Sequence, residues 1–117
     1  MNTYGVSPES FRLMLESFSK YPQIREVVLF GSRAKGTYKK GSDIDLAIKG
    51  DRPLPDVALN LQAWLNEELP IPYKVDVVDY HSLSRQNLIE HIDRVGISIY
   101  KNDCRQGLST VNKFKPN

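Results

Sequence analysis

The residues best suited to chemistry lie between Gly31 and Leu46, in the stretch GSRAKGTYKKGSDIDL. It begins with Gly31-Ser32, whose backbone N–H groups and hydroxyl can bind an anion such as a phosphate. It ends with Asp43 and Asp45, which one isoleucine separates. Because alternate residues of a strand point to the same face, both carboxylates can act as hard oxygen ligands for Mg²⁺. A phosphate-binding turn next to a metal-binding carboxylate pair is what chemistry on a nucleoside triphosphate requires.

Positive charge is concentrated in the same stretch, although the whole chain is nearly neutral. The 117 residues include 16 Lys and Arg and 14 Asp and Glu, and the net charge of +2 gives no reason to expect direct nucleic-acid binding. Arg33, Lys35, Lys39 and Lys40 all lie between the Gly-Ser turn and the first aspartate. Arg33 is a candidate nucleotide ligand, with a solvated loop position as the alternative. We interpret the three lysines as solvent-exposed.

The apolar pattern predicts the elements that position this stretch. The expected elements are a helix over residues 8–20, a strand over 24–30, a strand over 43–49, a helix over 56–68, a strand over 73–80, a helix that starts at 82–84 and ends at 96, and a short strand over 97–100. Ser7 is expected to cap the first helix and Ser82 or Ser84 the last, with Gly96 as the C′ residue. This order predicts a small α/β (α+β) domain with helices packed on a mixed sheet, over residues 1–101. Residues 102–117 are expected to form a polar tail.

The third predicted strand, YKVDVVDY, carries two more acidic residues on opposite faces. Asp76 can meet Asp43 and Asp45 only if this strand lies next to the one that carries them. On strand phase we prefer Asp76 as the third site carboxylate and interpret Asp79 as a residue at the strand end. The two histidines are interpreted as structural or exposed, because carboxylates and metals suffice for this chemistry.

At these residues the sequence resembles the nucleotidyltransferase superfamily that includes DNA polymerase β, and in particular the minimal nucleotidyltransferase (MNT) proteins that pair with HEPN-domain partners. The signature is Gly-Ser, a spacer of about ten residues, Asp-x-Asp, and a third acid on a later strand. Here residues 33–42 separate Ser32 from Asp43, and GSRAKG stands complete. The resemblance covers most of residues 24–100 and implies a polymerase β-like nucleotidyltransferase palm.

The resemblance also implies a role for each matching residue. Gly31, Ser32 and the amides that follow would hold the triphosphate of ATP. Asp43 and Asp45 would hold two Mg²⁺ ions, and Asp76 would bind a metal and orient or deprotonate the acceptor hydroxyl. The implied reaction is transfer of AMP from ATP to a tyrosine of a HEPN toxin, with this protein as the antitoxin.

Two other functions stay open at this point. One is an antibiotic-type nucleotidyltransferase subunit that acts on a small hydroxyl compound, and the other is an antitoxin that only binds its partner. Residues 101–117 are too few for the added helical domain of larger relatives, so we expect a second polypeptide to complete the acceptor site. The single cysteine, Cys104, and the lack of a long apolar run favour a cytoplasmic protein without a membrane anchor.

Overall fold

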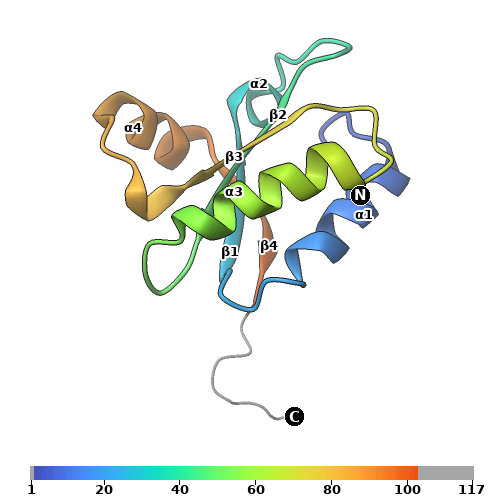
Figure 1. Ribbon diagram of the computed structural model, residues 1–117. Coiled ribbons are helices and arrows are strands. Elements are labelled where there is room, and N and C mark those ends of the chain that lie inside the picture. The colour runs from blue at the N-terminus through green and yellow to red at the C-terminus, as the bar shows by residue number, and fades with distance from the viewer. Residues whose placement is uncertain (1, 103–117) are drawn as a thin grey trace, which may run out of the picture.

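The computed structural model describes residues 2–102, which form a four-stranded sheet with helices on both faces (Figure 1). The helices are α1 (Pro8–Phe18), α2 (Gly31–Lys35), α3 (Pro55–Ala63) and α4 (Gln86–Val95). The strands are β1 (Glu26–Phe30), β2 (Ile44–Lys49), β3 (Val75–Asp79) and β4 (Ile97–Lys101). A π-helical turn, Trp64–Glu68, continues α3, and a 3₁₀ turn, Tyr80–Ser82, follows β3. The predicted polar tail lies outside the described residues from position 103 onward.

The strand order is β3-β2-β1-β4, and the sheet is mixed, as the sequence predicts. Strand β1 pairs antiparallel with both β2 and β4, whereas β2 and β3 are parallel. The parallel pair is possible because α3 and its π-helical turn supply the long crossover connection that such a pair needs. Strands β2 and β3 are therefore neighbours, and Asp45 is the register partner of Asp76.

One face of the sheet carries the main hydrophobic core. Strands β2 and β3 follow the predicted alternation, and α1 and α3 cover this face (Figure 1). The side chains buried here include Phe11, Met14, Phe18, Val27, Leu29, Ile44, Leu46, Ile48, Leu61, Leu65, Val75 and Val77. Trp64 packs against this core as predicted, and its indole Nε1–H donates to Ser17 Oγ at 2.9 Å.

The opposite face carries a smaller core beneath α4. Val28 and Phe30 of β1, Ala47 of β2 and Ile92 of α4 are its buried members. Because α4 is a single helix of ten residues, it covers only part of this face. The acid-bearing ends of β2 and β3 lie on this same face, so they are covered less than the main core.

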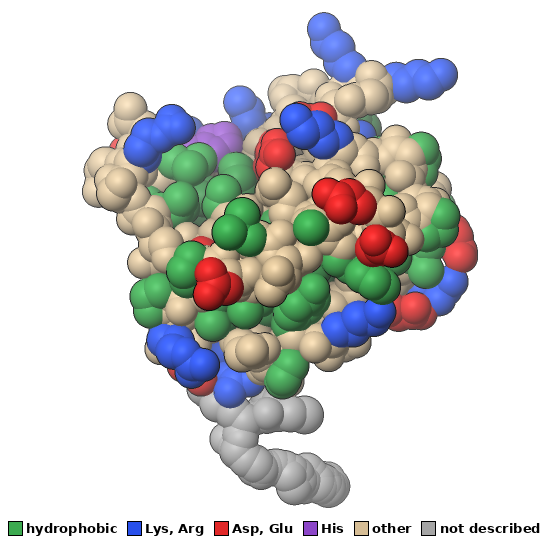
Figure 2. Space-filling view, viewed as in Figure 1, with side chains coloured by type: hydrophobic (Ala, Val, Ile, Leu, Met, Phe, Trp, Pro, Cys, Tyr) green, Lys and Arg blue, Asp and Glu red, His purple; other side chains and the backbone are tan. Residues whose placement is uncertain are grey.

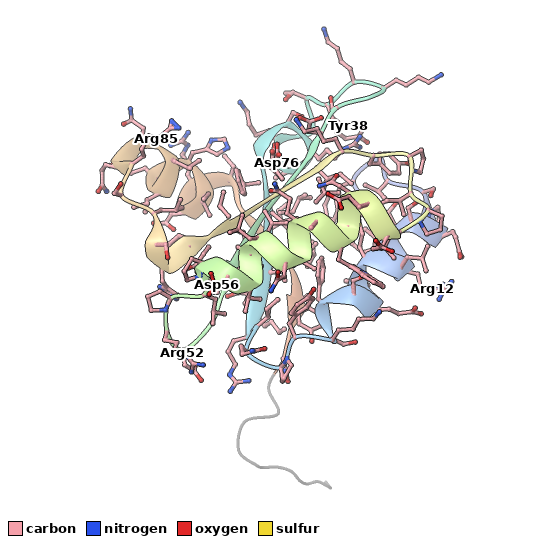
Figure 3. The ribbon with its side chains drawn as sticks, in the orientation of Figure 1. Arg12, Tyr38, Arg52, Asp56, Asp76 and Arg85 are labelled. Atoms are coloured by element: carbon pink, nitrogen blue, oxygen red, sulfur yellow. The ribbon has the colours of Figure 1, made fainter. Side chains whose placement is uncertain are left out.

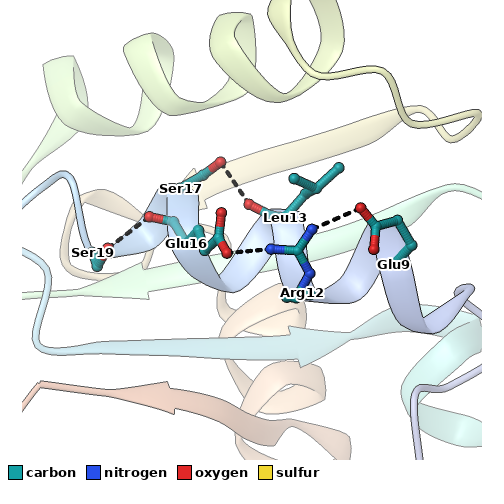
Figure 4. A network of polar contacts seen from close by, with 6 residues as sticks. All are labelled: Glu9, Arg12, Leu13, Glu16, Ser17 and Ser19. Carbon is teal, nitrogen blue, oxygen red and sulfur yellow. Dashed lines mark hydrogen bonds and ion pairs between the residues drawn. The ribbon is translucent and has the colours of Figure 1, made fainter.

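Helix α1 begins as the sequence predicts. Ser7 Oγ accepts a hydrogen bond from the Ser10 N–H at 3.2 Å, and Pro8 occupies the first turn. Figure 4 shows the polar contacts of the helix, among them the ion pairs of Arg12 with Glu9 and Glu16. These side chains are more than half exposed, so the ion pairs add little to the free energy of unfolding.

The expected caps of α4 are wrong. The helix starts after Arg85 without a side-chain cap, and Ser82 instead donates to Asp79. Gly96 follows the helix with φ −62°, so it is not a left-handed C′ residue. A Cβ at Gly96 would lie 2.4 Å from the carbonyl oxygen of Ile92. Glycine is therefore needed here for close packing and not for a positive φ.

Helix α2 was not expected from the sequence, which indicated a loop after Gly31-Ser32. Its signal is Gly36, which adopts φ +82° directly after Lys35. Glycine is the residue that adopts this left-handed conformation at a helix end without strain. No helix among residues 2–102 is long and apolar enough to cross a membrane.

Candidate active site

The structure brings the three predicted carboxylates to one end of the parallel strand pair. Asp43 directly precedes β2, Asp45 lies within it, and Asp76 lies beside Asp45 on β3. Figure 3 labels Asp76 on β3, at the end of the sheet where the loop with Tyr38 extends outward. Asp45 and Asp76 are half-buried and Asp43 is exposed. The strand phase that the sequence indicated thus places all three acids at the partly open face.

The electrostatics of Asp45 are those of a carboxylate crowded by like charges. Burial raises the pKa of Asp45 above its usual range, and repulsion from Asp76 and then Asp43 raises it further. His91 and Arg33 act in the opposite direction on the same pKa. Positive charge placed between these carboxylates would relieve the repulsion.

The donor set fits Mg²⁺ in an open site. Among residues 2–102, no three acidic, histidine or cysteine side chains are gathered closely enough to enclose a metal ion. Mg²⁺ does not need such a cage, because it is usually bound through one or two carboxylates together with substrate phosphates and water. Asp43, Asp45 and Asp76 offer hard oxygen ligands of this kind next to the Gly-Ser turn.

Gly31 allows the turn to approach the carboxylates closely. It follows β1, begins α2 and has φ +74°. A Cβ at this position would lie 2.2 Å from Asp45 Oδ2, so any side chain would displace that carboxylate. The first N–H groups of a helix have no partner within the helix. The turn therefore places the start of α2, which includes Ser32, directly beside Asp45 of β2.

His91 is part of this site, which the sequence analysis missed. Its Nε2 accepts a hydrogen bond from the Gly31 N–H at 3.2 Å, and its ring packs edge-on against Phe30 at 6.0 Å. The Gly31 amide is thus already occupied, and the amides that follow it are the ones left for a phosphate. Sixty residues separate the two partners, and no spacing rule connects them. Only the packing of α4 on β1 reveals the contact.

Arg33 lies in a different environment from the one expected. It is 3% exposed, and its guanidinium donates to the carbonyl oxygens of Tyr4 and Ser42. These contacts favour a role in holding backbone segments, and nucleotide contact by Arg33 stays a prediction. Lys35, Lys39 and Lys40 are exposed, as interpreted from the sequence. Figure 2 shows basic side chains projecting at this end of the molecule.

Asp79 belongs to the other face. It is 5% exposed, and its Oδ2 accepts hydrogen bonds from the Leu54 N–H at 2.7 Å and from the Ser82 hydroxyl. It thereby joins the end of β3 to the start of α3. Its neighbours are structural, which agrees with the preference for Asp76 as the site carboxylate.

The fold and the arrangement of the site agree with a family match. The family described as polymerase beta, nucleotidyltransferase matches residues 14–105. This covers most of the chain, and the protein belongs to this family.

The chain is also similar to an individual protein that is named for its activity. The chain is 36% identical over 74 residues to a probable protein adenylyltransferase MntA of Haemophilus influenzae. This alignment covers 63% of the chain and 64% of the relative, so the chain spans somewhat less than two thirds of the relative's length.

Solved structures of toxin–antitoxin complexes share the fold. One was determined with AMP-PNP; it is 26% identical, has a TM-score of 0.62, and the match covers 81% of this chain and 73% of that one. Another is described as a tri-AMPylated Shewanella oneidensis HEPN toxin in complex with MNT antitoxin. That match has a TM-score of 0.55 at 24% identity and covers 78% of this chain and 73% of that one, and it shows a shared fold only.

Proposed function

We propose that this protein is a Mg²⁺-dependent nucleotidyltransferase that transfers AMP from ATP to a hydroxyl group. The observation that carries the proposal is the pairing of Asp45 with Asp76 directly beside Gly31. Carboxylate oxygens, which are hard ligands, therefore lie next to the proposed phosphate-binding turn at the partly open face of the sheet. Membership in the nucleotidyltransferase family supports the same chemistry.

Each group of the site has a task in this reaction. Ser32 and the amides that follow Gly31 at the start of α2 bind the triphosphate and orient its α-phosphorus. Asp43 and Asp45 would hold the Mg²⁺ ions. Asp76 orients the acceptor hydroxyl and accepts its proton. The acceptor oxygen forms a bond to the α-phosphorus, the bond from that phosphorus to the oxygen bridging to the β-phosphate breaks, and pyrophosphate leaves.

Two Mg²⁺ ions, when bound, would neutralise charge on the attacking and leaving oxygens. The raised pKa of Asp45 supports Asp45 as a metal ligand, because a nearby cation would relieve its repulsion by the two other carboxylates. His91 keeps the turn in place by accepting the Gly31 N–H. These residues thus bind and orient the reactants and hold the proton of the acceptor.

The acceptor that we propose is a tyrosine of a HEPN-domain toxin, with this protein as its antitoxin. The likeness to a probable protein adenylyltransferase supports a protein acceptor. The likeness to a chain from a structure of an AMPylated HEPN toxin in complex with MNT antitoxin supports this kind of partner. The open edge of the site supports it too, since a second protein could cover it.

The test is label transfer from α-phosphate-labelled ATP and Mg²⁺ to protein in lysate of the source cells. We expect one labelled protein that co-purifies with this chain, and its labelled residue should be a tyrosine. The Asp43→Asn/Asp45→Asn double variant is the matched control and should give no label.

Other outcomes would redirect the proposal. Pyrophosphate release only when small hydroxyl compounds are added would replace the protein acceptor by a small molecule, as in antibiotic-type enzymes. A co-purifying partner without label or pyrophosphate release would replace catalysis by binding alone. Equal labelling by the double variant would refute the site.

A further inference from the structure

Arg33 lies where three segments of the candidate active site meet. Its Nη1 donates to the Tyr4 carbonyl oxygen at 3.1 Å and its Nη2 to the Ser42 carbonyl oxygen at 2.7 Å. Tyr4 belongs to the N-terminal turn, and Ser42 directly precedes Asp43. Arg33 itself is in α2, two residues after Gly31. One guanidinium therefore connects the phosphate-binding turn to the loop that delivers the first carboxylate.

Two aromatic rings complete its surroundings. The guanidinium carbon lies 5.2 Å from the ring centre of Tyr38 and 5.3 Å from that of Tyr73. The Tyr73 hydroxyl also accepts the N–H of Ser7, the residue that caps α1. A planar guanidinium can stack on such rings while its fork donates to two separate carbonyls, and a lysine ammonium cannot reproduce this geometry.

The N-terminal turn is shaped to fit this group. Tyr4 has φ +57°, an uncommon value for a residue other than glycine, and Gly5 has φ +79°. A Cβ at Gly5 would lie 2.3 Å from the Tyr38 ring and 2.9 Å from Arg33 Nη1. The turn lies before residues 14–105, which the family match covers. Contact with α2 nevertheless places it next to the candidate active site.

Burial leaves the donors of Arg33 little access to a phosphate, since the residue is only 3% exposed. Both terminal nitrogens donate to carbonyls, and Nε is buried without a partner in the part of the chain that the structure describes. Contact with a phosphate would require the guanidinium to leave these carbonyls and both rings.

We propose that Arg33 is a positioning residue that fixes Asp43 relative to the Gly31-Ser32 turn, and that the N-terminal turn is part of this clamp. The Arg33 clamp consists of Arg33 with Tyr4, Tyr38, Ser42 and Tyr73. The inference rests on the proposed function for its kinetic consequence, but its structural content does not depend on the acceptor. It replaces the nucleotide contact that the sequence suggested for Arg33.

Two variants test the clamp from opposite sides. Arg33→Lys keeps the charge but loses the fork, and Gly5→Ala pushes on Tyr38 and Arg33 without changing α2. Trp64→Phe is the control, because it removes the bond to Ser17 Oγ where the π-helical turn after α3 contacts α1, away from Arg33.

The first readout is amide hydrogen exchange of residues 3–6 and 38–43, which needs no substrate. Both clamp variants should exchange faster in both segments, and the control should match the wild type there. The second readout is steady-state transfer. We expect kcat to fall about 10- to 100-fold with little change in the KM for ATP, because misplaced reacting groups slow the chemical step.

Wild-type exchange in both clamp variants would overturn the inference. So would a raised KM for ATP with unchanged kcat in Arg33→Lys, which is the result expected for a phosphate ligand. A wild-type protein that transfers no nucleotide would refute the proposed function alone, since hydrogen exchange would still decide whether the clamp exists.

Discussion

The face of the sheet under α1 and α3 is closed by apolar side chains, whereas the opposite face is closed only where α4 lies on it. Both faces use the same strands. On β2, Ile44, Leu46 and Ile48 are fully buried in the main core, and Asp45 points the other way. On β3, Val75 and Val77 alternate with Asp76 in the same manner.

This difference separates stability from chemistry within one sheet. Burial of the closed face supplies most of the hydrophobic stabilisation, since that term scales with the apolar area removed from water. The open face can then hold Asp45 beside Asp76 and Asp43, which repel it, and these carboxylates make no such contribution. Substitutions on the two faces should therefore affect different measurements.

The largest effect is expected for the acids of β2. Asp45→Asn and Asp43→Asn should each lower the rate of AMP transfer by about 10³-fold, because each removes a proposed ligand of the Mg²⁺ ions that would stabilise the transition state. Urea denaturation should find neither variant less stable than the wild type. The control is Asp56→Asn, at an exposed aspartate in the first turn of α3, labelled in Figure 3. Transfer by Asp45→Asn at the rate of this control would refute the assignment.

A second comparison uses the two acids of β3, which lie on opposite faces. Asp76→Asn should lower transfer by about 10²-fold or more with little change in stability. Asp79→Asn should leave transfer within a few-fold but lower the free energy of unfolding by about 1–2 kcal/mol, because charge-assisted bonds to Leu54 N–H and Ser82 weaken. Transfer rates and urea denaturation measure the two effects. The reverse ranking would show that Asp79 is the functional acid.

Local patterns predicted most of this separation. Period-2 alternation placed Asp43 and Asp45 on one face of their strand and separated Asp76 from Asp79 on the next. The structure confirms that these two strands are neighbours, which the meeting of Asp76 with Asp45 required. The Ser7-Pro8 start of α1 and the burial of β1 also followed from local residue types.

What the sequence did not reveal depends on contacts between distant segments. The bond from the Gly31 N–H to His91 and the carbonyl contacts of Arg33 arise only when α4 and the N-terminal turn pack beside α2. Gly96 was misinterpreted for the same reason, since its need for glycine comes from Val28 and Ile92 and not from its own φ. Local spacing contains no signal for such contacts.

A third prediction compares core positions of the two faces. Leu61→Ala, at a residue with 0% exposure in the main core, should lower the free energy of unfolding by about 3 kcal/mol. Val78→Ala, at a half-buried residue packed against the smaller core, should cost about 1 kcal/mol. Urea denaturation of both variants measures the difference. Equal costs would mean that α4 closes its face as tightly as α1 and α3 close theirs.

The smallest expected effect concerns how far the charge on Asp45 lowers the stability of the folded protein when no metal is bound. Burial and two like charges raise the pKa of Asp45, so the folded protein binds this proton more tightly than the unfolded chain does. Wild-type stability should therefore fall as the pH rises through that raised pKa. In Mg²⁺-free buffer at pH 7, Asp45→Asn should raise the Tm by a few degrees. This advantage should shrink as the pH falls through the raised pKa, because the wild-type carboxyl becomes neutral too.

Thermal melts of both proteins across pH, with Asp56→Asn as the control, measure this difference. A variant less stable than the wild type at pH 7 would show that the surroundings of Asp45 stabilise its charged form. The open face would then not lower the stability of the fold at Asp45, and the contrast with the closed face would be refuted there.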